Sequence, residues 1–231
     1  MTSAAWSPNT FLGGLPEATA KELVGLSTQR QFAPGRVVLR EGDREGHVEL
    51  LISGFVKVTT SVDGFETLLG IRVPGELVGE VGALTGQPRN ATVTTCGRVT
   101  AGVVSRAAFE DFLRRHPPAA ARVMAAVAGQ LSWANRRRTD FAVYPAHVRL
   151  ARLLVEIGEL CGRPAPNGAI EIGVPLSQPE LATMIAIAQA TVQNAIRELR
   201  GRGLLSTGYR RLTILDPAGM RALAELGPET P

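Results

Sequence analysis

The chain has 231 residues, 45% of them hydrophobic and 20% charged, which is typical of a globular protein and unlike a disordered or collagen-like chain. No apolar run reaches the roughly 18 residues that a membrane helix needs, and residues 1–10 lack the regions of a secretory signal. Two cysteines, Cys96 and Cys161, are too few for a disulfide scaffold. We therefore expect a cytoplasmic protein without a membrane partner.

The formal net charge of +4 is unevenly distributed along the chain. Residues 1–116 contain 12 Lys or Arg and 12 Asp or Glu, whereas residues 117–231 contain 13 and 9. A neutral first half and a basic second half indicate an anionic partner for the second half. A general preference for Arg is the alternative, because all but two of the 25 cations are Arg.

The first half is predicted to be a short helix followed by an all-β region. Residues 15–26 read as an amphipathic helix with Pro16 in its first turn. Between residues 31 and 104, short apolar runs alternate with Gly-containing turns, which is typical of a sandwich or a barrel. The predicted strands lie at residues 37–39, 48–52, 55–58, 67–73, 91–95 and 99–104.

Helices are predicted after Ser105, a suitable N-cap. The first covers residues 106–115, His116-Pro117-Pro118 interrupts it, and a longer helix runs from Ala119 to about residue 143. Apolar residues of the longer helix follow a 4-3 spacing, which predicts pairing with a second copy rather than packing on its own domain. We interpret Arg136–Arg138 as a solvated face, with Asp140 or a partner helix as the alternative contact. The seam positions are Ala120, Met124, Val127, Leu131, Ala134, Arg138 and Phe141, of which Arg138 breaks the pattern.

The remaining residues predict a compact domain. Tyr144-Pro145 resets the helix, a helix covers residues 146–160, a Pro/Gly loop spans 162–168, and a strand spans 169–174. Ser177-Gln178-Pro179-Glu180 is a capping box that starts a helix with Leu181, Met184 and Ile185 inward. After a turn at residues 186–188, a second helix covers residues 189–201, with Val192, Ile196 and Leu199 inward. This is a helix-turn-helix pattern, and residues 204–215, with Gly208 at the turn, read as a wing.

The second helix of this pattern has an outward face rich in side-chain amides, which can pair with adenine in the major groove. Other exposed hydroxyl, amide and guanidinium groups suit phosphate contacts. The alternative is a helical hairpin with a solvated polar face. The candidate base-reading residues are Gln189, Ala190, Gln193, Asn194 and Arg197, and the candidate phosphate contacts are Ser177, Gln178, Thr191, Arg202, Arg210 and Arg211.

A second motif lies in the β region. Residues 75–84 are Gly-rich, and residues 86–93 place Arg89 just before a strand. Backbone amides of such a turn can hold a phosphate, a buried Arg adds charge-assisted hydrogen bonds, and Glu80 can accept from a ribose hydroxyl. An internal Arg89–Glu80 salt bridge is the structural alternative.

These motifs together resemble the cyclic-AMP receptor protein (Crp/Fnr-type) family of transcription regulators over roughly residues 10–224. The resemblance rests on residues 32–35, 41–43, 52–58 and 79–91 and on the helix-turn-helix, all in family order. It implies an α+β chain with an N-terminal cyclic-nucleotide-binding β-roll, a long dimerisation helix and a C-terminal winged helix-turn-helix. We expect domains at residues 1–118, 119–144 and 145–231.

The resemblance also implies a ligand, with cyclic AMP as first choice and cyclic GMP as alternative. Gly79 and Glu80 fall on the ribose-binding positions, Arg89 on the phosphate-binding arginine, and Asn90 replaces the usual Ser or Thr. Ala134 and Asn135 fall where cyclic-AMP responders often have a Thr-Ser pair, which leaves the choice of base open. A roll that binds no ligand is the alternative. The implied ligand residues are Gly79, Glu80, Val81, Arg89, Asn90, Ala91, Ala134 and Asn135.

The resemblance implies a homodimer, joined through the 119–144 helix, that binds double-stranded DNA, and contacts RNA polymerase if it is an activator. Gln189, Ala190 and Asn194 differ from the well-known responders, so the operator should differ too. Two cysteines exclude an iron–sulfur sensor, and no catalytic set indicates an enzyme. The alternatives are a regulator without a ligand or with another effector, and a nucleotide sensor whose C-terminal domain binds protein.

Overall fold

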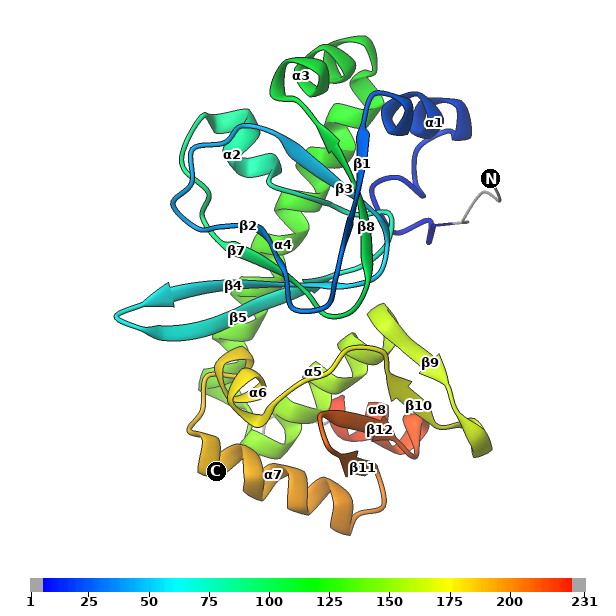
Figure 1. Ribbon diagram of the computed structural model, residues 1–231. Coiled ribbons are helices and arrows are strands. Elements are labelled where there is room, and N and C mark those ends of the chain that lie inside the picture. Colours follow the sequence, from blue (N-terminus) through cyan, green and yellow to red (C-terminus); the bar gives the residue numbers. More distant parts are fainter. Residues whose placement is uncertain (1–5, 226–231) are drawn as a thin grey trace. The chain divides into compact units, whose positions relative to one another are not determined.

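The computed structural model describes residues 6–225, which form two compact units divided between Leu131 and Ser132. The first unit carries two four-stranded antiparallel sheets with strand orders β1-β8-β3-β6 and β2-β7-β4-β5 (Figure 1). The elements of this part are α1 (Glu17–Gly25), β1 (Thr28–Phe32), β2 (Val37–Leu39), β3 (Val48–Ser53), β4 (Val56–Val62), β5 (Phe65–Arg72), β6 (Leu77–Val78), α2 (Glu80–Thr85), β7 (Thr92–Thr95), β8 (Val99–Val104), α3 (Arg106–Arg115) and α4 (Pro117–Val143).

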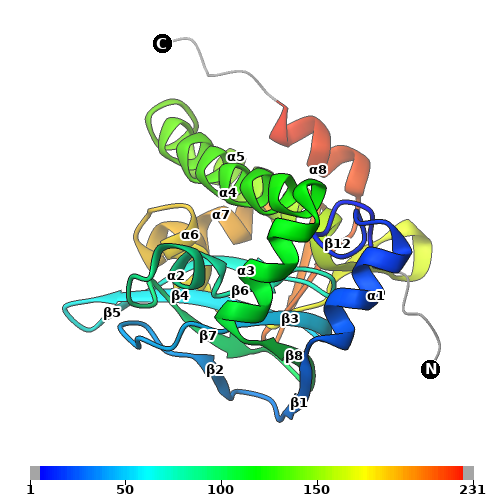
Figure 2. The ribbon, with the colours of Figure 1, turned by 90° about the horizontal axis from the view of Figure 1, so that it is seen from above.

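Successive side chains of β3 pack into two different hydrophobic cores. Leu51 packs with Val56 and Val93 between the sheets, whereas Leu50 packs with Phe109 and Phe112 of α3. Successive side chains of a strand point to opposite faces, so one sheet serves both cores. Figure 2 shows α1, α3 and the first turns of α4 on the helical side of this sheet.

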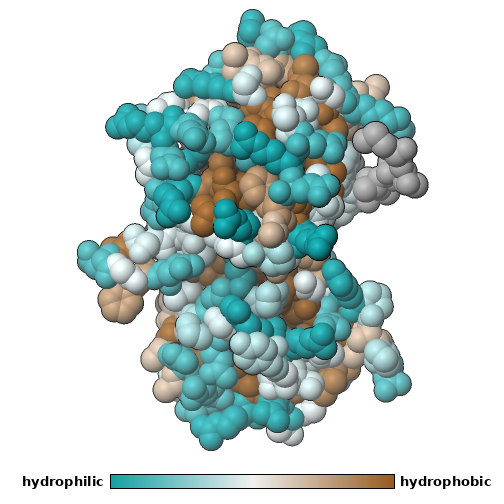
Figure 3. Space-filling model, in the orientation of Figure 1, coloured by the Kyte–Doolittle hydropathy of each residue, from teal (hydrophilic) through white to brown (hydrophobic). Residues whose placement is uncertain are grey.

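The predicted strands are confirmed, but two were missed. The β1 strand begins at Thr28 in a polar, largely exposed sequence, and β6 has only two residues, so neither carries a hydrophobic pattern. The β4–β5 hairpin ends in exposed apolar side chains, with Val62 67% and Phe65 79% exposed, and Figure 3 shows apolar residues at this tip.

In its described residues, the second unit packs helices around a sheet of order β11-β12-β10-β9. Its core includes Leu150 and Leu154 of α5, Ile185 after α6 and Leu199 of α7, all fully buried. Besides the end of α4, its elements are α5 (Ala146–Cys161), β9 (Gly162–Pro164), the 3-10 turn η1 (Pro166–Gly168), β10 (Ile170–Ile172), α6 (Gln178–Met184), α7 (Gln189–Gly201), β11 (Leu205–Gly208), β12 (Arg211–Ile214) and α8 (Pro217–Ala224).

Besides shifts of a few residues at the ends of elements, three regions differ from the prediction. Pro117 and Pro118 lie in the first turn of α4, where a missing N–H costs nothing, so the interruption is at His116. Residues 162–168 are not all loop, because β9 pairs with β10. In the wing, Gly208 pairs with Arg211, which places the turn at Tyr209 and Arg210.

No helix within residues 6–225 has the length and apolar character needed to cross a membrane.

Candidate functional site

Arg89 lies buried in the first unit, at the start of the β7 segment, with 4% of its surface exposed. Its Nη1 donates to the carbonyl of Gly79 at 2.6 Å, and its Nη2 donates to the carbonyl of His47 at 2.5 Å. The Nε atom is buried without a hydrogen-bond partner among the described residues. A buried guanidinium with an unused donor is a group that an anionic ligand would satisfy.

Gly79 allows Arg89 to occupy this position. Its φ of +84° favours glycine, and a Cβ there would lie 2.5 Å from Arg89 Nη1. Gly79 immediately precedes α2, so the turn, the short helix and the guanidinium form one packed unit. The Gly-rich sequence is therefore required by close packing as well as by backbone conformation.

Glu80 is the first residue of α2 and is only 5% exposed. Burial raises the pKa of its carboxyl above the ordinary value, opposed by a backbone hydrogen bond and by the charge of Arg72. Gln130 of α4 places its Nε2 3.5 Å from Glu80 Oε1. A buried acceptor with an adjacent amide can receive a hydroxyl hydrogen bond from a bound sugar.

The environment of Arg89 is strongly acidic. Burial lowers the pKa of its guanidinium, and Glu45, Glu49, Glu80 and Asp43 oppose this in decreasing order. Sequence reasoning missed Gln130 and the His47 carbonyl. Gln130 lies one turn before Ala134 on α4, so the helical period could have indicated it. A main-chain carbonyl carries no sequence signal.

The other predicted ligand residues are less enclosed. Ala91 is buried, Val81 is half-buried, and Asn90 is exposed. Ala134 and Asn135 are exposed on the part of α4 that belongs to the second unit.

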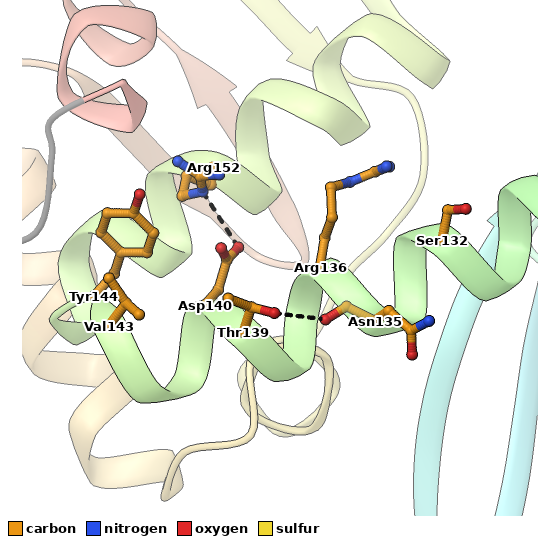
Figure 4. A pocket seen from close by; sticks show the side chains of 8 residues that line it. All are labelled: Ser132, Asn135, Arg136, Thr139, Asp140, Val143, Tyr144 and Arg152. Atoms are coloured by element: carbon orange, nitrogen blue, oxygen red, sulfur yellow. Dashed lines mark hydrogen bonds and ion pairs between the residues drawn. The ribbon is translucent and has the colours of Figure 1, made fainter.

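Asn135 lines a pocket of about 510 Å³ between the end of α4 and the start of α5 (Figure 4). Asp140 points toward Arg152 in this pocket, with Arg152 Nε 3.2 Å from Asp140 Oδ2. The guanidinium of Arg152 also lies 4.6 Å from the Tyr144 ring centroid, and its Nη1 donates to the carbonyl of Ala224. Two of the charged groups that line this pocket, Asp140 and Arg152, are thus paired with each other.

Arg137 corrects the interpretation of Arg136–Arg138 as a solvated face. It is 4% exposed, its Nη2 lies 2.5 Å from Glu156 Oε2, and it stacks over Trp133 at 4.8 Å. Trp133 Nε1 donates to the same carboxylate oxygen. The Arg137 side chain of α4 is therefore buried because α5 runs alongside α4 and brings the Glu156 carboxylate within hydrogen-bond distance.

The helix-turn-helix is confirmed in detail. Ser177 and Glu180 form the predicted capping box, and α6 and α7 bury the predicted apolar residues. The turn is strained, because Ala186 has a φ of +46°. Ala188 stands at the N-cap of α7 without a side-chain hydrogen bond.

The predicted DNA residues are mostly solvent-exposed. Ser177 is half-buried, and its hydroxyl donates to Glu180 at 2.8 Å. Arg197 donates to Asn194 Oδ1, Arg202 lies 2.6 Å from Glu198, and Arg211 lies 4.0 Å from Glu171. The exposed residues of the set are Gln178, Gln189, Ala190, Thr191, Gln193, Asn194, Arg197, Arg202, Arg210 and Arg211.

Within residues 6–225, no three His, Cys, Asp or Glu side chains are grouped so that they could hold a metal ion. Burial raises the pKa of the Cys161 thiol to about 11, which keeps it protonated and unreactive near neutral pH.

Two family models match the chain, one within the first unit and one within the second. A cyclic nucleotide-binding domain matches residues 29–116, and a Crp-like helix-turn-helix domain matches residues 148–223. The first contains Gly79, Glu80 and Arg89, and the second contains α6, α7 and the wing.

Curated regulators are similar to this chain over most of its length. A CRP-like cAMP-activated global transcriptional regulator of Mycobacterium tuberculosis is 27% identical over 210 residues, covering 89% of this chain and 92% of the relative. The HTH-type transcriptional regulator Cmr of the same species is 26% identical, covering 85% and 76%. A solved CRP-family regulator from Thermus thermophilus shares the fold, with a TM-score of 0.70, 24% identity, and coverage of 87% of this chain and 98% of that one.

Proposed function

The chain belongs to the Crp/Fnr-type family of transcription regulators, and we propose that it is a homodimer whose DNA binding is controlled by a cyclic nucleotide. The observation that carries the nucleotide proposal is the buried Arg89 with its unpartnered Nε, packed against Gly79 beside the buried Glu80. Arg89 would hold the cyclic phosphate, and Glu80 with Gln130 would hold the ribose. The relative from Mycobacterium tuberculosis that is cAMP-activated supports cyclic AMP as the first ligand to test.

Calorimetry with cyclic AMP and cyclic GMP tests this proposal. Arg89→Ala should abolish binding of the nucleotide that the wild-type protein binds, because a phosphate in a buried site loses its charge-assisted hydrogen bonds. Arg98→Ala, an exposed arginine of the same unit, should bind normally. Binding of neither nucleotide at millimolar concentration, or unchanged affinity of Arg89→Ala, would reject the proposed ligand site and leave the ligand-independent regulator as the alternative.

The homodimer is proposed from the exposed seam of α4. Met124 is 73% and Leu131 63% exposed, with Val127 and Phe141 each 37% exposed. Side chains of this size in a heptad repeat are stabilised by a second identical helix, and a twofold axis along α4 brings equal positions together.

DNA binding is proposed through α7 and the wing. The amides of Gln189 and Gln193 are exposed on α7 and suit base edges, whereas the exposed hydroxyl of Thr191 and the guanidiniums of Arg202 and Arg211 suit phosphates. A dimer would present two α7 helices to major grooves about 34–36 Å apart.

Salt-dependent binding separates DNA recognition from a C-terminal domain that binds protein. Affinity for a selected duplex should fall with a log–log slope of about −0.9 for each neutralised phosphate. Arg211→Ala should make that slope shallower by about one unit, because one phosphate contact is lost. Arg221→Ala, on α8, is the control and should keep the wild-type slope. A flat slope would favour the protein-binding alternative.

Control by the nucleotide is proposed to run through α4. Gln130 of this helix contacts Glu80, and later turns of the same helix bury Arg137 against Glu156 of α5. A ligand that rearranges Glu80 can therefore shift α4 between two arrangements of the dimer, a population shift that DNA would sense. We expect the protein to act in the cytoplasm and, if it activates transcription, to contact RNA polymerase.

A further inference from the structure

The tip of the wing has two features that do not serve its own stability. β11 and β12 pair up to Gly208 and Arg211, so Tyr209 and Arg210 form the whole turn. Arg210 has a φ of +54°, at a position of a four-residue turn that usually holds Gly or Asn. Tyr209 is 92% exposed, the highest value among the exposed large hydrophobic and aromatic side chains of the described residues.

The backbone conformation of Arg210 is costly to the free protein. A non-glycine residue at positive φ is strained, and strain of this kind is retained mainly where a function needs the side chain. An exposed tyrosine ring is one that a partner can cover. The turn therefore presents a guanidinium and an aromatic ring to something outside the unit.

The charges around the wing distinguish Arg210 from its neighbours. Arg202 lies beside Glu198, and Arg211 faces Glu171 at 4.0 Å. Within residues 6–225, Arg210 has no carboxylate at ion-pair distance, and it is exposed. Its guanidinium is thus a cation without a paired carboxylate, at the tip of the β11–β12 hairpin.

We infer that the wing tip enters the minor groove of DNA beside the major groove occupied by α7, and that Arg210 gives preference for A·T pairs there. This inference rests on the proposed DNA binding. The extended side chain of Arg210 is slim enough for a groove about 6 Å wide, which an α-helix is not. A narrow A·T-rich minor groove concentrates negative potential and attracts an unpaired guanidinium, whereas the 2-amino group of guanine obstructs the groove floor. Tyr209 covers the sugar–phosphate edge and adds affinity without choosing a base.

The test begins with a duplex selected by the full-length protein from random-sequence DNA, with and without cyclic AMP. The base pairs on both sides of the sequence bound by α7 are then changed in blocks from A·T to G·C and to inosine·C. Inosine lacks the 2-amino group of guanine, so inosine·C has the minor-groove acceptors of A·T and the major-groove pattern of G·C. Wild type should bind the G·C duplex about tenfold more weakly than the A·T duplex, and inosine·C should restore the affinity.

Arg210→Gly is the informative variant, because glycine adopts a positive φ without strain and lacks the guanidinium. Its melting temperature should equal or exceed that of the wild type, and its discrimination between A·T and G·C flanks should disappear. Tyr209→Ala should weaken binding to all three duplexes by a similar factor. Arg221→Ala should preserve the discrimination.

Inosine·C flanks that behave like G·C, or full discrimination by Arg210→Gly, would overturn the inference while leaving DNA binding through α7 intact. Recovery of no duplex in the selection would overturn both the inference and the proposed DNA binding.

Discussion

The buried carboxyl of Glu80 lowers the stability of the folded protein when it is charged. Desolvation raises its pKa, so in the unliganded protein the folded state holds its proton to a higher pH than the unfolded chain, which titrates near 4.5. As the pH rises above 4.5, the Glu80 carboxyl ionises in the unfolded chain before it ionises in the folded protein. The free energy of unfolding therefore falls as pH rises from 4.5 through the folded pKa.

Glu80→Gln should remove that loss. We expect the unliganded variant to be more stable than the wild type at neutral pH, with a gain that shrinks toward pH 4.5, because the amide stays neutral. Urea unfolding at several pH values measures it, and Glu66→Gln, an exposed change in the same unit, is the control. A gain that does not vary with pH would show that Glu80 acts by packing and not by charge. Nucleotide binding should weaken, since an amide accepts more weakly than a carboxylate.

At the scale of the element, α7 is well specified by its apolar face but poorly capped. Ala188 has extended backbone angles that suit an N-cap, and it lacks the side-chain acceptor that would satisfy a free N–H of the first turn. Ala186, two residues earlier, adds positive-φ strain. The turn between the two helices therefore combines an uncapped helix start with backbone strain.

Ala188→Ser should stabilise the protein by about 1 kcal/mol, because serine can accept a hydrogen bond from the start of α7. Chemical unfolding measures the gain. Ala190→Ser, inside the helix, should give no gain, since serine has a lower helix propensity than alanine. Equal effects of the two substitutions would contradict the capping explanation.

At the scale of the whole molecule, the exposed apolar seam on α4 bears on whether the protein functions as a monomer or as a dimer. Met124 and Leu131 occupy equivalent heptad positions one repeat apart. A twofold axis would place each beside its own copy, so a charge introduced there would face the same charge on the partner helix.

Leu131→Glu should weaken dimerisation by about a hundredfold or more, because a leucine contact is lost and two like charges are buried together. Sedimentation equilibrium measures it. Ala125→Glu, exposed on α4 but outside the seam, is the matched control and should leave the dimer intact. If both variants dissociate equally, the seam is not the interface.

Much of the fold was predictable because its signals are local. The capping box joins Ser177 and Glu180 three residues apart, and the inward residues of α7 follow the helical period, so no distant contact is needed to recognise them. The strands with apolar alternation were found for the same reason. β1 and β6 were missed because one is polar and the other has two residues, so only pairing with β8 and β3 makes them strands.

The sequence by itself determined the two-domain plan, the helix-turn-helix and the identity of Arg89, Gly79 and Glu80 as a motif. Only the tertiary structure decided what these groups contact. Arg89 finds the carbonyl of His47 across 42 residues, and Gln130 reaches Glu80 across 50. Arg137 is buried because Glu156 returns beside it on α5. The physical reason is that periodicity and capping depend on neighbours within a few residues, whereas the burial of a charge depends on partners that only chain folding brings together.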